Sequence, residues 1–171
     1  MVLNMTVTLS IPEEIYRVLK EQADKLGKDI IEIIIDSIVP IVDPDTRVNI
    51  YTMLHEKYLR EAEDLVEKGD LVQASEKYWG AVTALLNAIG EIRKMPHYSH
   101  RDYSEIIEKI AEETSDPSLS SLFANVERIH ANFYHNFLKK ATFEELRRNI
   151  LKLIEKLKNY IKTQTKRKLQ Q

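Results

Sequence analysis

Residues 128 to 135 read RIHANFYH and contain the first pair of side chains whose spacing suggests chemistry. Arg128 and His135 have six residues between them, so in a helix they lie on one face, about 10 Å apart along the axis. Imidazole can take or give a proton near neutral pH. A fixed guanidinium can stabilise the negative charge on a phosphate. The pair is therefore a candidate catalytic set, with one group for proton transfer and one to stabilise the charge on a phosphate.

Further polar residues extend this pair into a stripe along the same helix. Asn125 and Asn132 fall on the stripe, and Lys139 lies at its end. We expect the stripe to face solvent or a second subunit, because the apolar positions lie roughly opposite. These positions are Leu122, Val126, Ile129 and Phe133. Asn132 is a third candidate catalytic residue, which could orient the imidazole, and Asn125 and Lys139 are candidate substrate-binding residues.

Three interpretations of the stripe remain open. It could be catalytic, it could be an inactive binding or dimer-interface surface, or it could be an ordinary solvated face of an amphipathic helix. One helix supplies only one Arg–His set, and a symmetric dimer would bring two sets together across its axis.

Charge is distributed unevenly along the chain. Residues 139–171 hold 11 lysines and arginines against 3 acidic residues, a net charge of +8, whereas residues 1–138 carry a net charge of −10. The basic C-terminal segment could bind a polyanion such as RNA, or the acidic body of a partner subunit.

The residue types present make several other kinds of site improbable. With no cysteine in the chain, a disulfide, a thiolate nucleophile and a cysteine-type zinc site are impossible. The sequence contains no HExxH motif and no Gly-rich phosphate loop, so we expect neither a metal nor a cofactor. His130 lies toward the apolar side of its helix and is interpreted as a core histidine. Trp79 falls at core spacing, so packing explains it better than base stacking.

The N-terminal part of the chain, residues 1–40, reads as a strand followed by two helices. Val7, Leu9 and Ile11 alternate with polar residues, which is typical of a strand. The second helix, roughly Lys28 to Val39, is apolar on nearly all sides and must be covered by another element.

This pattern resembles the ribbon-helix-helix fold, in which two chains pair their strands. The resemblance implies a dimerisation module whose outward strand residues Thr6, Thr8 and Ser10 would enter the major groove of DNA. These three side chains are short and uncharged, and none can make a bidentate contact with a base. Dimerisation alone is therefore the alternative to DNA binding.

The rest of the chain predicts a mainly α fold. We expect a linker at 41–49, a five-helix up-and-down bundle at 50–163 and a frayed basic tail at 164–171. The longest apolar run is interrupted by charged residues and a proline, so no membrane span is expected and the protein is placed in the cytoplasm.

Residues 54–91, from LHEKYLREAEDL to LLNAIGE, closely resemble the PaREP family of archaeal proteins, and HANFYHNF at 130–137 adds to the match. The resemblance covers roughly residues 47–161. This family falls within the wider HEPN class of helical bundles. Many HEPN proteins are dimeric, metal-independent ribonucleases of toxin or defence type. Their mark is an arginine and a histidine separated by four to six residues on one helix.

Arg128 and His135 match that HEPN motif. The resemblance therefore implies a homodimer acting on RNA, with an antitoxin as a further candidate partner. Active members often carry a polar residue directly after the arginine, and this chain has Ile129 there. His130 or Asn132 would have to take its place. Other HEPN proteins have lost activity and only bind their partners, which leaves a non-catalytic dimeric binding module as the alternative.

Overall fold

The computed structural model describes residues 7–26 and 29–168, and nearly all of the regular structure within these ranges is helical. The chain divides into two compact units, Met1–Val42 and Asp43–Gln171. No helix in the described ranges is both long enough and apolar enough to cross a membrane.

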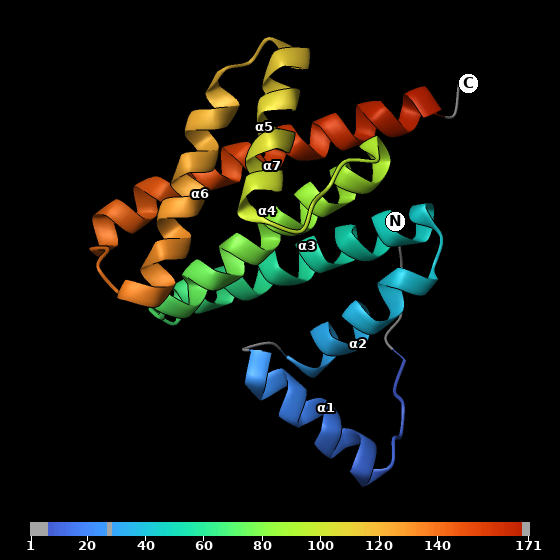
Figure 1. Cartoon of the computed structure of the whole chain (residues 1–171). Helices are drawn as coiled ribbons and strands as arrows, with labels where there is room; N and C mark the ends of the chain where they lie inside the picture. Colours follow the sequence, from blue (N-terminus) through green and yellow to red (C-terminus); the bar gives the residue numbers. More distant parts are fainter. Residues whose placement is uncertain (1–6, 27–28, 169–171) are drawn as a thin grey trace. The chain divides into compact units, whose positions relative to one another are not determined.

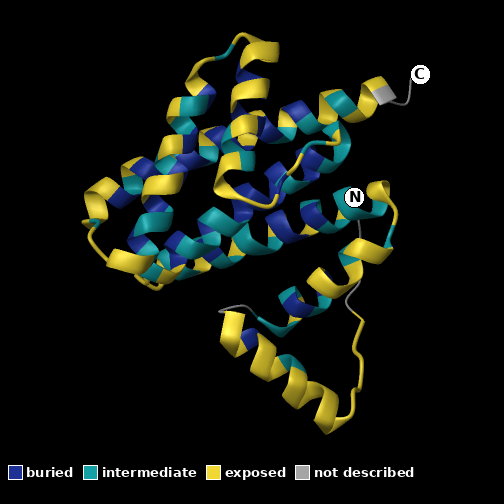
Figure 2. Cartoon of the chain, viewed as in Figure 1, coloured by how far each residue is buried: buried dark blue, intermediate teal, exposed yellow. Residues whose placement is uncertain are grey.

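The first unit contains two α-helices and a short 3-10 helix (Figure 1): α1 (Glu13–Leu26), α2 (Ile30–Ile38) and η1 (Val39–Ile41). Asp29 caps α2, because its carboxylate accepts a hydrogen bond from the backbone N–H of Glu32. Only part of the apolar surface of this unit is buried (Figure 2). Large apolar side chains remain exposed on both helices, including Ile15, Val18, Leu26, Ile31 and Ile38.

The predicted fold, a strand–helix–helix module before a five-helix bundle, is wrong. The described residues contain seven α-helices, two in the first unit and five in the second, and no strand. Val7, Leu9 and Ile11 alternate as a strand would, but a strand needs a hydrogen-bonded neighbour, and residues 7–12 are irregular and exposed. Thr8 and Ser10 therefore do not form the outer face of a ribbon. Thr6 lies outside the described residues.

The second unit is built around one central helix, α4, which packs against each of the other four helices of the unit. The helices are α3 (Pro44–Glu67), α4 (Leu71–Arg93), α5 (His100–Thr114), α6 (Ser118–His135) and α7 (Lys140–Lys168). In Figure 2 the buried residues gather along the inner faces of these helices. The largest fully buried side chain is Tyr78 of α4, and Phe143 of α7 packs beside it with ring centroids 6.2 Å apart.

Short polar turns connect these helices. Gly69 adopts a φ of 79° at the turn between α3 and α4, a conformation that glycine tolerates without strain, and Asp70 then caps α4 through the N–H of Gln73. At the next connection, Ser99 and Asp102 form a reciprocal capping box at the start of α5. Local hydrogen bonds therefore fix the residues at which α4 and α5 begin.

The two C-terminal helices differ in extent from the sequence-based expectation. We predicted that the helix containing Arg128 continues to about Lys139, but α6 ends at His135, because Asn136 takes a left-handed conformation with a φ of 46°. α7 continues through Lys168, beyond the end predicted at about Lys162. Arg128 and His135 consequently lie in the last two turns of α6 and not in its middle.

Candidate functional site

Arg128 and His135 both lie exposed on α6. Neither side chain makes a hydrogen bond or an ion pair with any residue in the described part of the chain, and His135 has only a ring contact with Tyr134. The difference of seven positions in the helix places their α-carbons about 10 Å apart along the axis. Both side chains are thus free to contact a molecule that approaches this face.

Asn132 has a different role from the one its spacing suggested. Its side chain is only 1% exposed, contrary to the expectation that the polar stripe turns away from the core. Its Nδ2 donates to Oγ of Ser75 on α4 at 3.0 Å, and its Oδ1 accepts from the backbone N–H groups of Phe137 and Leu138 at 2.9 and 2.8 Å. The amide therefore ends α6 and fixes the following loop, and its burial keeps it from contacting a substrate.

The two candidate substrate-binding residues differ in how available they are. Asn125 is half-buried, and its Nδ2 donates to the carbonyl of Ser121 at 2.6 Å while its Oδ1 accepts from Asn149 at 3.4 Å. Lys139 is exposed in the loop before α7. Lys139 can contact a ligand directly, whereas Asn125 is already bonded within its own unit.

Two exposed aromatic side chains extend this surface, and the sequence analysis did not single them out. Tyr134 is 65% exposed next to His135, and Phe137 is 46% exposed in the following loop. Exposed apolar side chains that lie next to one another can mark an interaction site. We define the α6 face as Arg128, Tyr134, His135, Phe137 and Lys139. The signal that could have identified it is NFYHNF at a helix end, where aromatic residues cannot all point into the core.

A second group of aromatic and titratable side chains lies on the neighbouring flank of α6. The ring of His130 stacks on Trp79 of α4 at 4.2 Å between centroids, and His100 of α5 stacks on the same indole at 4.6 Å. Each imidazole has a carboxylate close to its Nδ1: Glu76 at 3.1 Å from His130, and Glu127 at 3.7 Å from His100. The sequence could not have revealed this group, since its members come from three helices.

This stacking explains why Trp79 is not available to a nucleic-acid base. Two imidazoles cover its ring, and Phe123 lies 6.4 Å away, centroid to centroid. The interpretation of Trp79 as a packing residue agrees with these contacts. His130 is mostly shielded, but it packs against an indole and a carboxylate and not within an aliphatic core.

A polar network joins α3, α4 and α7 inside the second unit. Arg147 forms an ion pair with Glu63, and its Nε donates to the hydroxyl of Tyr78 at 2.6 Å. The same hydroxyl donates to Oε1 of Glu63 at 2.5 Å. Burial alone would raise the pKa of Glu63, but the hydrogen bonds from Arg147 and Tyr78 outweigh it and lower that pKa. Arg147, predicted only as part of a basic segment, is therefore a structural residue.

The described residues hold no group of three or more histidine, aspartate or glutamate side chains that could bind a metal ion. The functional groups of the α6 face are therefore a guanidinium, an imidazole, an ammonium group and two aromatic rings. Such a surface can bind phosphate groups and stack on bases, and it contains one group able to transfer protons.

Comparison with known proteins identifies a family. A family model described as the archaeal PaREP1/PaREP8 family matches residues 50–154, which includes most of the second unit and the whole of α6. No curated protein and no solved structure matches the chain. The matched segment spans more than half of the sequence, and the chain therefore belongs to the archaeal PaREP1/PaREP8 family.

Proposed function

We propose that this protein associates with RNA in the cytoplasm through the α6 face, and that Arg128 and His135 are the pair that can cleave it without a metal ion. The observation that carries the proposal is that both side chains are exposed on one face of α6 and unbonded within the described chain. Tyr134 and Phe137 add stacking surfaces, and Lys139 adds a positive charge for the backbone.

In the cleavage step, neutral His135 would take the proton of a ribose 2′-hydroxyl. The 2′-oxygen then bonds to the adjacent phosphorus, the bond from phosphorus to the 5′-oxygen breaks, and that oxygen takes up a proton. The products are a 2′,3′-cyclic phosphate and a 5′-hydroxyl. Arg128 would stabilise the additional negative charge on the phosphorus centre during the transfer.

A single α6 face holds one histidine, which can serve as base or as acid but not as both in one step. A homodimer would supply the second imidazole, as the resemblance to dimeric HEPN nucleases also implies. The exposed apolar side chains of α1 and α2, among them Ile15, Val18 and Ile31, favour association with a second copy. A toxin-type nuclease would in addition need an inhibitory protein partner of the antitoxin kind.

A second function, RNA binding without cleavage, is favoured by two neighbouring residues. The position after Arg128, often polar in active HEPN proteins, holds Ile129, which is fully buried. Of the two residues that could take its place, Asn132 is committed to the end of α6, and His130 stacks on Trp79. On this view, the α6 face of a dimer is a binding surface alone.

Incubating labelled single-stranded RNA with the full-length protein in the presence of EDTA tests both functions. We expect wild type to yield fragments ending in a 2′,3′-cyclic phosphate, and His135→Ala and Arg128→Ala each to slow cleavage by about 100-fold or more. Arg148→Ala, which removes an exposed arginine of α7, is the matched control and should cleave like wild type.

The outcome of this experiment separates the two functions. RNA binding that needs Arg128 but produces no cleavage would identify a binding module. Neither binding nor cleavage at low salt would reject both functions.

A further inference from the structure

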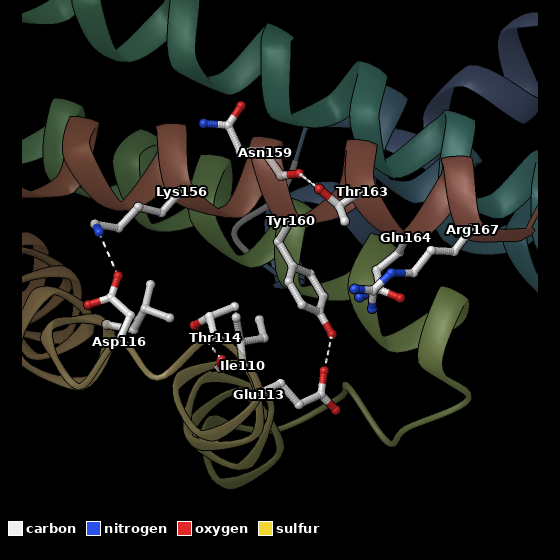
Figure 3. A pocket seen from close by; sticks show the side chains of 11 residues that line it. Ile110, Glu113, Thr114, Asp116, Lys156, Asn159, Tyr160, Thr163, Gln164 and Arg167 are labelled. Atoms are coloured by element: carbon white, nitrogen blue, oxygen red, sulfur yellow. Dashed lines mark hydrogen bonds and ion pairs between the residues drawn. The ribbon is translucent and has the colours of Figure 1, made fainter.

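A cavity of about 300 Å³ lies in the second unit between α5, the start of α6 and the second half of α7 (Figure 3). Residues from all three helices line it, including Ile110 and Glu113 of α5, Leu119 of α6, and Tyr160 and Arg167 of α7. Ligand sites for small molecules begin at about this volume. None of these residues belongs to the α6 face, so the cavity is a separate site from the one proposed above.

The acidic groups in the wall of the cavity are already neutralised by their neighbours. The carboxylate of Glu113 forms an ion pair with Arg93, and its Oε2 accepts a hydrogen bond from the hydroxyl of Tyr160 at 2.8 Å. Asp116 forms an ion pair of 2.6 Å with Nζ of Lys156. These contacts leave neither carboxylate free to attract a cation, so the site does not select for a positively charged ligand.

One charge in the wall has no such partner. Arg167, at the end of the cavity away from Lys156 in Figure 3, makes no hydrogen bond or ion pair within the described chain. A guanidinium in this state offers paired N–H donors, which match the oxygens of a phosphate or a carboxylate in a bidentate geometry. The exposed end of the cavity therefore favours an anion.

The floor of the cavity is apolar, because Ile110 and Leu119 are 3% and 2% exposed and the ring of Tyr160 lies beside them. This floor is small, and polar residues make up the rest of the wall, so a long hydrocarbon chain would be poorly covered. A flat ring system with polar edges fits better. A ligand that fits both ends of the cavity carries one phosphate group and one planar ring system.

We propose that this cavity binds a nucleoside monophosphate, either free or as one residue of an RNA strand. The phosphate lies at Arg167 and the base lies against Ile110 and Leu119. An RNA residue in this position would continue onto the exposed basic side of α7, where Lys152, Lys162 and Lys166 follow one another along the helix.

Calorimetric titration of the full chain with AMP, adenosine and inorganic phosphate tests this assignment. AMP should bind at least about tenfold more tightly than either fragment, because only AMP uses both ends of the cavity. Arg167→Ala should weaken AMP binding about tenfold and leave adenosine binding unchanged. Lys166→Ala removes an adjacent exposed charge outside the wall and should change AMP binding less than about twofold.

Thr114→Trp is the complementary variant, because Thr114 lines the cavity from an exposed position and the indole would fill it. Circular dichroism checks that it folds. If it weakens both AMP and an eight-residue RNA, the natural occupant is an RNA residue. If it weakens AMP alone, the occupant is a free nucleotide. Unchanged binding of both, or equal losses for Lys166→Ala and Arg167→Ala, would overturn the assignment.

Discussion

The imidazole of His97 fills the space beside the α-carbon of Gly90. A β-carbon built on Gly90 would lie 2.5 Å from Nδ1 and 2.6 Å from Cβ of that histidine. The ring is fixed in this place, because Nδ1 donates to the carbonyl of Met95 at 2.8 Å and Nε2 lies 3.3 Å from Oε1 of Glu91. The loop after α4 can therefore close against the helix only where the helix lacks a side chain.

Replacing Gly90 with alanine should destabilise the protein. The methyl group forces His97 out of its position, and overpacking of this kind costs about 1–3 kcal/mol, more than the ~1 kcal/mol that alanine gains from helix propensity. Urea denaturation followed by circular dichroism would measure the loss as a lower midpoint.

Gly80→Ala is the matched control, since it lies in the same helix and its nearest neighbour is the flexible side chain of Tyr58 at 3.1 Å. Its stability should stay within about 0.5 kcal/mol of wild type. A Gly90→Ala variant as stable as Gly80→Ala would show that His97 can move without cost.

Asn132→Ala should cost about 2–4 kcal/mol of folding free energy. The substitution leaves the N–H groups of Phe137 and Leu138 without their acceptor, while the hydroxyl of Ser75 keeps only its hydrogen bond to the carbonyl of Leu71. Thermal unfolding measured by calorimetry would report the loss as a reduced Tm.

For comparison, Asn125→Ala removes a half-buried amide bonded mainly within its own helix, and should cost less than about 1 kcal/mol. If the two asparagine variants unfold together, Asn132 does not hold the end of α6 as its contacts indicate.

Helix content and helix order could be predicted here because caps and apolar periodicity are local signals. Asp70 with Gly69 marks a helix boundary in the sequence, and the structure places the turn there. The strand expected from Val7, Leu9 and Ile11 failed for a related reason: alternation is local, whereas strand pairing requires a partner that the sequence does not specify.

The candidate site could be predicted only in part. Helical spacing correctly placed Arg128 and His135 together on one exposed face. Asn132 lies only about 40° from Arg128 around the helix axis, and helical spacing gave no sign that its side chain would be buried. Its burial depends on a contact with Ser75 of another helix. The stack of His100 and His130 on Trp79 is likewise a tertiary contact without a sequence signal.

Protein stability should fall as the pH drops from 7.5 to 5.5 (about the range of histidine titration), and His55 should be a cause. Its side chain is fully buried, and burial lowers its pKa. A base whose folded-state pKa lies below its unfolded value is neutral in both states at high pH. As the pH falls through the unfolded value, near 6.5, only the unfolded chain takes up the proton, and folding free energy is lost.

The measurement is urea unfolding at several pH values for wild type and His55→Gln. Glutamine keeps a donor for the carbonyl of Ala81, which Nδ1 of His55 meets at 2.8 Å, but it does not titrate. The variant should be less stable than wild type at pH 7.5 and show a smaller slope with pH. Parallel slopes would assign the pH dependence to other groups.

Arg147 and Arg148 are neighbours in sequence, both form ion pairs, and only Arg147 should matter for stability. Arg147 donates to Tyr78 and pairs with Glu63 across three helices in a partly buried site, whereas Arg148 pairs with Glu145 on the exposed side of α7. Burial raises the pKa of Tyr78, and the hydrogen bond that its hydroxyl donates to Glu63 raises that pKa further, so the hydroxyl keeps its proton and remains a donor.

Arg147→Ala should therefore cost about 2–4 kcal/mol, because the carboxylate of Glu63 and the hydroxyl of Tyr78 lose their shared partner in a site from which water is partly excluded. Arg148→Ala should cost less than about 1 kcal/mol. Urea unfolding at 0.05 and 0.5 M NaCl separates them further, since salt screens an exposed pair far more than a partly buried one. Equal losses for the two variants, removed equally by salt, would mean that the network adds no more than a surface ion pair.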